Sequence, residues 1–298
     1  MSVHDRIVDA HHHLWDLSHC HYPWLMEKGV RRFFGDPTPI QKDYVARDFL
    51  SDIGDLEVTK TVHIQVGVAP EDAVKETAWL QSTAEAFGLP HAIVAFADLT
   101  AADLEAQLDA HAQHDRLRGI RQIVGRSAEE DRRTGTQGLL SNEAFLTGLR
   151  ALAARGLSFD LQLTPPLMQA TADLLEQVPD LKVALCHAGS PSDFSEDGLA
   201  EWRSGLERLS RLPNLICKLS GFGMFQPDWT INTIRPLALE AIEIFGRQRI
   251  AIGSNFPVDK LCSSYRDIMG ALMSIIEEFP DEERESILAG CAERFYQI

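Results

Sequence analysis

Short apolar runs rich in β-branched residues alternate with helix-patterned segments along the whole chain of 298 residues, and this alternation limits the possible folds more than any other feature. The runs with strand character are residues 6–11, 60–66, 92–99, 117–124, 158–163, 182–187, 215–219 and 249–255. The segments with helical periodicity are about 70–87, 102–111, 142–155, a stretch ending at 177, 199–212, 234–245, 265–279 and 281–296. Such alternation is typical of parallel βαβ units. About eight units close into a (β/α)8 TIM barrel, and we expect residues 1–298 to form it as a single domain, because no linker or break in composition divides the chain.

The segment between residues 14 and 47 is too long and too aromatic for a plain connection. It carries Trp15, Trp24, Phe33 and Phe34 among other aromatic and proline residues. Long irregular segments of this kind form active-site lids or pocket walls, or else ordinary packed surface loops. The sequence leaves both possibilities open.

Composition narrows the class of partner. The formal net charge of −16 argues against nucleic acid and against an anionic membrane surface as partners, although a basic pocket can still lie inside an acidic protein. The five cysteines are scattered and form no C-x-x-C pair, so neither a disulfide framework nor a zinc ribbon is indicated. No apolar run resembles a signal peptide or a membrane span. We expect a cytoplasmic protein that acts on a small molecule, with its oligomeric state left open.

Three consecutive histidines stand at the end of the first predicted strand, and they belong to it if the strand runs from Arg6 to His13. On a strand, side chains alternate between faces, so His11 and His13 point one way and His12 points the other. Two imidazoles on one face can bind one metal ion or polarise one substrate oxygen. The alternative is a histidine-rich terminus or tag remnant, which the apolar strand context argues against.

Polar residues recur near the carboxyl ends of the other predicted strands, where a TIM barrel places its chemistry. They are His63, Gln65, Arg121, Gln122, Asp160, Gln162, His187, Lys218, Ser220, Ser254 and Asn255. Any one of them is readily explained as a hydrogen-bonded polar residue at a strand terminus. The whole set is not, because buried strands are otherwise apolar.

With these pieces in hand, the chain resembles the lactonase-like branch of the amidohydrolase superfamily. The matching motifs are VDAHHHLWD, HYPWL, VHIQV, ETAWLQ, LRGIRQ, FDLQL, LCHAGSP, CKLSGFGM, IGSNFPVD and AERFYQI. They run from the first strand to the last helix. Each motif is weak alone, and the combination is specific to this branch.

The resemblance implies a distorted (β/α)8 barrel whose metal or substrate-oxygen histidines map to His11, His13 and His187. The strand-eight acid, the usual general base, maps to Asn255, which is a departure from the family pattern. Gln162 lies near the position that is histidine in metal-rich members, so a binuclear centre is not expected. The implied cofactor is one divalent ion, zinc, on His11, His13 and His187, although some members of the branch work without metal.

We interpret the protein as a lactone-type hydrolase in which His11, His13, His187 and Asn255 form the catalytic set. The expected substrate-binding residues are His63, Arg121, Gln162, Lys218 and Trp229. Arg121 and Lys218 would hold a carboxylate or ring oxygens. An amide cannot serve as the base, so His187, His63, Asp160 and Asp259 remain candidates. A metal-dependent decarboxylase of the same superfamily and a ligand-binding barrel that has lost catalysis are the alternatives.

Overall fold

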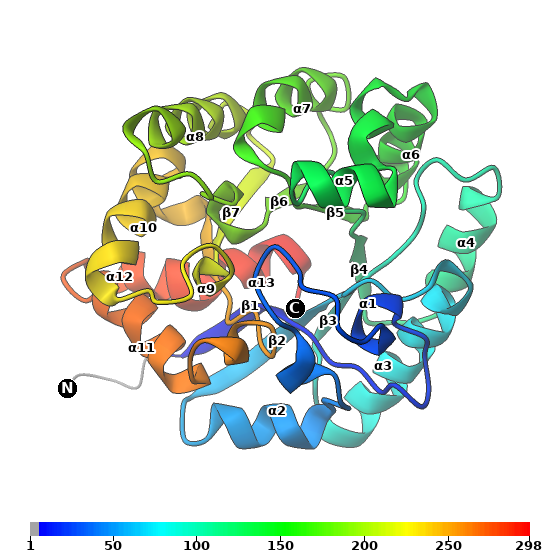
Figure 1. Cartoon of the computed structure of the whole chain (residues 1–298), viewed down its shortest axis with the longest axis horizontal. Helices are drawn as coiled ribbons and strands as arrows, with labels where there is room; N and C mark the ends of the chain where they lie inside the picture. Colours follow the sequence, from blue (N-terminus) through cyan, green and yellow to red (C-terminus); the bar gives the residue numbers. More distant parts are fainter. Residues whose placement is uncertain (1–5) are drawn as a thin grey trace.

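The computed structural model describes residues 6–298, and eight parallel strands form one sheet in the order β1 to β8. The strands are β1 (Ile7–His12), β2 (Val58–Ile64), β3 (Ala92–Ala95), β4 (Leu117–Ile120), β5 (Ser158–Leu161), β6 (Val183–Leu185), β7 (Leu215–Leu219) and β8 (Ile250–Ile252). Just beyond β8, the Asn255 amide donates to the His11 carbonyl and the His13 amide donates to the Phe256 carbonyl, each at 2.7 Å. These bonds join the last strand to the first, so the predicted (β/α)8 barrel is confirmed (Figure 1).

Helices surround the ring of strands in Figure 1. They are α1 (Pro23–Met26), α2 (Ala46–Ile53), α3 (Ala73–Phe87), α4 (Leu104–His111), α5 (Ala128–Thr134), α6 (Glu143–Ala154), α7 (Met168–Leu175), α8 (Glu196–Ser210), α9 (Phe222–Phe225), α10 (Ile231–Phe245), α11 (Tyr265–Ile275), α12 (Asp281–Glu285) and α13 (Cys291–Tyr296). The helix expected at 281–296 is divided by a π-helical turn, Ser286–Gly290. Within residues 6–298, no helix combines the length and apolar character needed to cross a membrane.

Several strands end earlier than the sequence pattern predicted. β3 ends at Ala95 rather than at residue 99, and β4 ends at Ile120 rather than at residue 124. The hydrophobic pattern extends past the end of each strand because the following residues are buried or half-buried, although their backbone has already left the sheet. Arg121, Gln162, His187 and Asn255 therefore lie in the loops just after their strands, where a side chain can turn into a central cavity. His63, Asp160 and Lys218 lie within the strands themselves.

The apolar core has two parts. A large cluster packs the outer face of the strands against the helices. A smaller cluster fills the barrel interior with short side chains such as Ala10, Val62, Val94 and Ala184. This inner cluster continues into α13, whose Tyr296 is 1% exposed. Helix α13 thus covers the base of the barrel, and the opposite end is left to the loops.

Candidate active site

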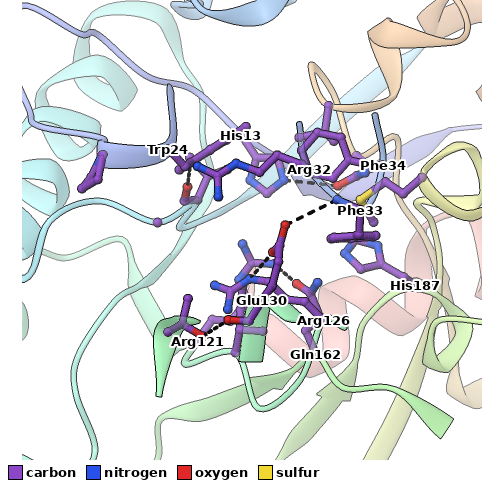
Figure 2. A pocket seen from close by; sticks show the side chains of 18 of the residues that line it. His13, Trp24, Arg32, Phe33, Phe34, Arg121, Arg126, Glu130, Gln162 and His187 are labelled. Atoms are coloured by element: carbon purple, nitrogen blue, oxygen red, sulfur yellow. Dashed lines mark hydrogen bonds and ion pairs between the residues drawn. The ribbon is translucent and has the colours of Figure 1, made fainter. Parts of the chain in front are cut away.

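A cavity of about 430 Å³ lies at the carboxyl ends of the strands. Loops after six strands contribute to its lining, through His13, Val66, Arg121, Gln162, His187 and Asn255. The segment between residues 14 and 47 adds Trp24, Arg32, Phe33 and Phe34 (Figure 2). Of the two possibilities for this segment, the structure supports a pocket wall.

Three histidines gather at the floor of this cavity. His13 and His187 line it, and His11 lies beside both, with ring centroids 5.1 Å from His13 and 4.5 Å from His187. Both ring nitrogens of His11 are buried without a hydrogen-bond partner among the described residues. Burial, reinforced by the neighbouring His187 and Lys218, holds the pKa of His11 well below 6.5. The ring is therefore neutral near pH 7, with a free lone pair.

His13, Asn255 and Asp259 lie in a row of polar contacts. Asn255 Nδ2 donates to Asp259 Oδ1 at 2.8 Å, which turns Asn255 Oδ1 toward His13 Nε2 at 3.2 Å. His13 Nδ1 lies 2.7 Å from the Ile64 carbonyl oxygen. Burial lowers the pKa of His13, and a neutral imidazole has only one N–H to donate. The shorter contact takes that N–H, so Nε2 and Asn255 Oδ1 face each other as two acceptors, and each can accept a hydrogen bond from a ligand.

His187 is held by its backbone and by Ser220. Its Nδ1 lies 3.0 Å from Ser220 Oγ, and its φ of 57° is in the left-handed region, like the φ of 56° at Asn255. Strained backbone of this kind clusters at functional sites. Burial lowers the pKa of His187 well below 6.5, and the nearby Arg121 adds to this shift. A neutral ring with Nδ1 engaged leaves Nε2 as the nitrogen that can accept a proton.

Arg121 is a buried cation with neutral partners. It is 3% exposed, and it donates from Nη1 to Gln162 Oε1 at 3.0 Å and from Nη2 to the Gln65 carbonyl. Its Nε has no partner, and no carboxylate among residues 6–298 forms an ion pair with it. Figure 2 shows Arg121, Arg126, Glu130 and Gln162 together on one side of the cavity, opposite His13 and Arg32. A guanidinium in this state favours an anionic or strongly hydrogen-bonding ligand.

Three of the expected substrate-binding residues are not among the residues that line this cavity. Lys218 is fully buried below the cavity, where its ammonium donates to Asp160 and, at 3.0 Å, to the Ala10 carbonyl. His63 Nε2 bonds the Leu14 carbonyl at 3.2 Å. Trp229 borders a separate small pocket. Lys218 and His63 lie in strands, as expected, but their polar groups are bonded to other parts of the protein, and Trp229 lies between α9 and α10.

His12 and two of the candidate bases, Asp160 and Asp259, make their contacts outside the lining of the cavity. His12 stacks on Phe49 of α2, with ring centroids 4.2 Å apart, and does not line the cavity. Asp160 carries the ion pair with Lys218. Asp259 reaches the cavity only through Asn255, and burial raises the pKa of its carboxyl to about 7.

Four charged lining residues were not found in the sequence: Glu27, Arg32, Arg126 and Glu130. All come from irregular or short helical segments rather than from strand ends. The one available signal was the i,i+4 spacing of Arg126 and Glu130, whose Nε and Oε2 atoms lie 3.8 Å apart. That spacing predicts a helix-surface pair as readily as a cavity wall.

Comparison with known proteins places the fold and the cavity in one family. The chain matches the amidohydrolase family over residues 8–298 and belongs to it. A similar chain is the uncharacterized protein y4mH of Sinorhizobium fredii, 39% identical over 98% of both chains. An L-fucono-1,5-lactonase of Burkholderia ambifaria is 26% identical, over 98% of this chain and 95% of its own. Among solved structures, an amidohydrolase from Burkholderia multivorans with bound zinc superposes with a TM-score of 0.83, at 25% identity, over 98% of this chain and 99% of its own. The protein is thus a member of a family of hydrolases.

Proposed function

We propose that the protein opens a small sugar-acid or carboxylated lactone by water attack on the ester carbonyl. The observation that carries this proposal is the buried Arg121, which has no ion-pair partner among residues 6–298 and lies in one cavity with His13 and His187. The similarity to L-fucono-1,5-lactonases supports the lactone class. Although the whole chain is acidic, three arginines line this cavity, Arg32, Arg121 and Arg126, against two glutamates. That excess of positive charge favours an anionic substrate.

Each group in the cavity has a role in this proposal. Arg121 and Gln162, joined by their own hydrogen bond, would bind the substrate carboxylate or ring oxygens. His11, neutral and with both ring nitrogens unpartnered among the described residues, would donate an N–H to the carbonyl oxygen as it gains charge during attack. His13, whose N–H is held by the Ile64 carbonyl, would accept a hydrogen bond from a substrate hydroxyl or the water at Nε2. Asn255 would orient the water, because an amide cannot accept its proton.

The general base in this proposal is His187. Its neutral ring can take a proton at Nε2 from water, the resulting hydroxide adds to the carbonyl carbon, and the ring C–O bond then breaks. The leaving alkoxide takes the proton back and yields the hydroxy acid. A lactone is activated enough for a base whose pKa is depressed. Of the other candidates, Asp160 is paired with Lys218, and Asp259 and His63 do not line the cavity.

One divalent ion, zinc, remains part of the proposal. Its support is the zinc-bound relative and the two unpartnered nitrogens of His11. The donor types suit zinc, but no three His, Cys, Asp or Glu side chains within residues 6–298 are arranged to hold one ion as they stand. We therefore derive no catalytic step through a metal. Metal analysis of the purified protein should give at most one zinc per chain, and two ions per chain would contradict the proposal.

The test follows acid release with a pH indicator over a panel of sugar-acid and carboxylated lactones. We expect turnover by the wild type and a loss of about 10²- to 10⁴-fold in kcat/KM for His187→Gln. His114→Gln changes a half-buried histidine in the turn that follows α4, and this matched control should keep full activity. Carbon dioxide release from carboxylated substrates without ring opening would identify a decarboxylase instead. Binding without turnover would identify a ligand-binding barrel.

A further inference from the structure

A second cavity, of about 700 Å³, adjoins the first. Its lining comes from the loops after β4, β5, β6 and β7, through residues such as Ser127, Thr164, Ser192 and Phe225. Phe33, Arg126 and Met224 belong to the linings of both cavities. A ligand that extends from the histidines past these three side chains would therefore enter the second cavity.

The chemistry of the second cavity differs from that of the first. Hydroxyl side chains from four places in the chain line it: Ser127, Thr136, Thr164 and Ser192. It also contains an aromatic wall, in which Phe33 and Phe225 stack with ring centroids 5.7 Å apart and an interplanar angle of 26°. A sugar-like ring has hydroxyl groups at its edge and C–H groups on its faces, so it can use both kinds of surface.

Arg126 lies where the two cavities meet. Its Nη1 is buried and has no hydrogen-bond partner among the described residues, and its nearest carboxylate contact is the 3.8 Å approach of Glu130 to Nε. Burial lowers the pKa of Arg126. A buried donor without a partner is costly, and an oxygen of a ligand passing between the cavities would supply the missing acceptor.

We propose that the second cavity is a substrate subsite and that the preferred substrate is a two-part molecule: a lactone ring at the histidines joined to a second hydroxylated ring between Phe225 and the hydroxyl side chains, with Arg126 bonding the oxygen that links the two. The inference rests on the proposed lactone hydrolysis for the first ring. It adds that a single-ring lactone fills only part of the site.

The experiment compares a six-carbon aldonolactone with the same lactone carrying a 4-O-hexosyl group, in the wild type and in two tryptophan variants. Ser192→Trp adds bulk at an exposed residue that lines only the second cavity. Ser51→Trp makes the same change at an exposed residue of α2 that lines neither cavity. We expect the wild type to prefer the larger lactone by about tenfold in kcat/KM. Ser192→Trp should remove this preference and change kcat/KM for the smaller lactone less than about twofold, and Ser51→Trp should leave both values unchanged.

Binding of the ring-opened acids, measured by calorimetry, separates this proposal from the lactonase proposal. The larger acid should bind the wild type about tenfold more tightly than the smaller one, and Ser192→Trp should bind both equally. If neither lactone is opened but the larger acid still binds more tightly, lactone hydrolysis fails and the subsite stands. Equal Kd values for the two acids in the wild type, or equal losses for both in Ser192→Trp, would overturn the subsite.

Discussion

The barrel interior and the cavity above it both bury a cation, and they treat it differently. Lys218 in β7 is 0% exposed and pairs with Asp160, which also accepts a hydrogen bond from Tyr296 at 2.8 Å. Arg121, in the loop after β4, is 3% exposed and has only neutral acceptors. The depth of burial is nearly the same, so burial does not separate the two sites. The two sites differ in the charge of the partner. The Asp160 carboxylate neutralises Lys218, whereas Arg121 has neutral partners and can bind an anionic ligand.

Lys218→Met should give the largest effect and act on stability. It leaves the Asp160 carboxylate without its cation in the apolar barrel interior, which costs about 3–5 kcal/mol in the free energy of unfolding. Urea denaturation measures this loss. The double variant Lys218→Met with Asp160→Asn should recover part of it, because it removes both charges. An exposed ion pair contributes at most about 1 kcal/mol. If Lys218→Met loses less than that in the free energy of unfolding, the Lys218–Asp160 pair is not a structural pair of the kind that distinguishes Lys218 from Arg121.

Glu76 extends the comparison to a third buried charge. This residue of α3 is 0% exposed and accepts a hydrogen bond from Tyr22 at 2.7 Å, and burial raises the pKa of its carboxyl from 4.5 to about 7. Because the folded pKa lies above the unfolded one, the contribution of Glu76 to stability is greatest below pH 4.5 and is lost as pH rises toward 7. Glu76→Gln should abolish this fall. Relative to wild type, the variant should gain about 3 kcal/mol between pH 4.5 and pH 8.

The measurement for Glu76 is urea unfolding of the wild type and Glu76→Gln at both pH values. Glu85→Gln, an exposed position of the same helix, is the control and should show no such gain. A constant difference between wild type and Glu76→Gln across this range would mean that the Glu76 carboxyl titrates normally.

Arg121→Met should show the opposite profile to Lys218→Met. Removing a cation without a counter-ion should leave the free energy of unfolding within about 1 kcal/mol of wild type. It should lower kcat/KM for an anionic lactone about 10²-fold, mainly through KM, because the charged hydrogen bonds to the substrate are lost. A neutral lactone should lose less. Destabilisation as large as that of Lys218→Met would show that Arg121 is structural.

Asn255→Asp should give the smallest of these effects, a loss of about tenfold in kcat/KM. The backbone conformation tolerates either residue, since Asn and Asp both adopt a φ of 56° readily. The new carboxylate would face Asp259 at the 2.8 Å separation now bridged by the amide, and its charge would repel an anionic substrate. Asn255→Asp combined with Asp259→Asn exchanges the two groups and should restore most of the loss. A gain in activity for Asn255→Asp alone would mean that the wild type lacks a useful base.

The strand–helix alternation was enough to predict the barrel, because period-2 and period-3.6 patterns are set by burial along the whole chain. It also located Arg121 and Gln162 near the cavity, since the loops after parallel strands share one end of a barrel. The alternation did not reveal that Lys218 lies below the cavity, because it tells which way a strand residue points and not how deep in the barrel the residue lies. Arg32 and Arg126 were not predicted because they lie in irregular segments without a hydrophobic periodicity. Only the folded chain places them in the same cavity as His13 and His187.

The contact between Tyr296 and Asp160 also joins the last helix of the chain to the charge pair in the barrel interior. β5 and β7, which carry Asp160 and Lys218, both precede α13 in the chain. Helix α13 covers that end of the barrel and brings the Tyr296 hydroxyl to the Asp160 carboxylate. A chain that ends before α13 should therefore lack this cover, with the Lys218–Asp160 pair open to solvent from the base of the barrel.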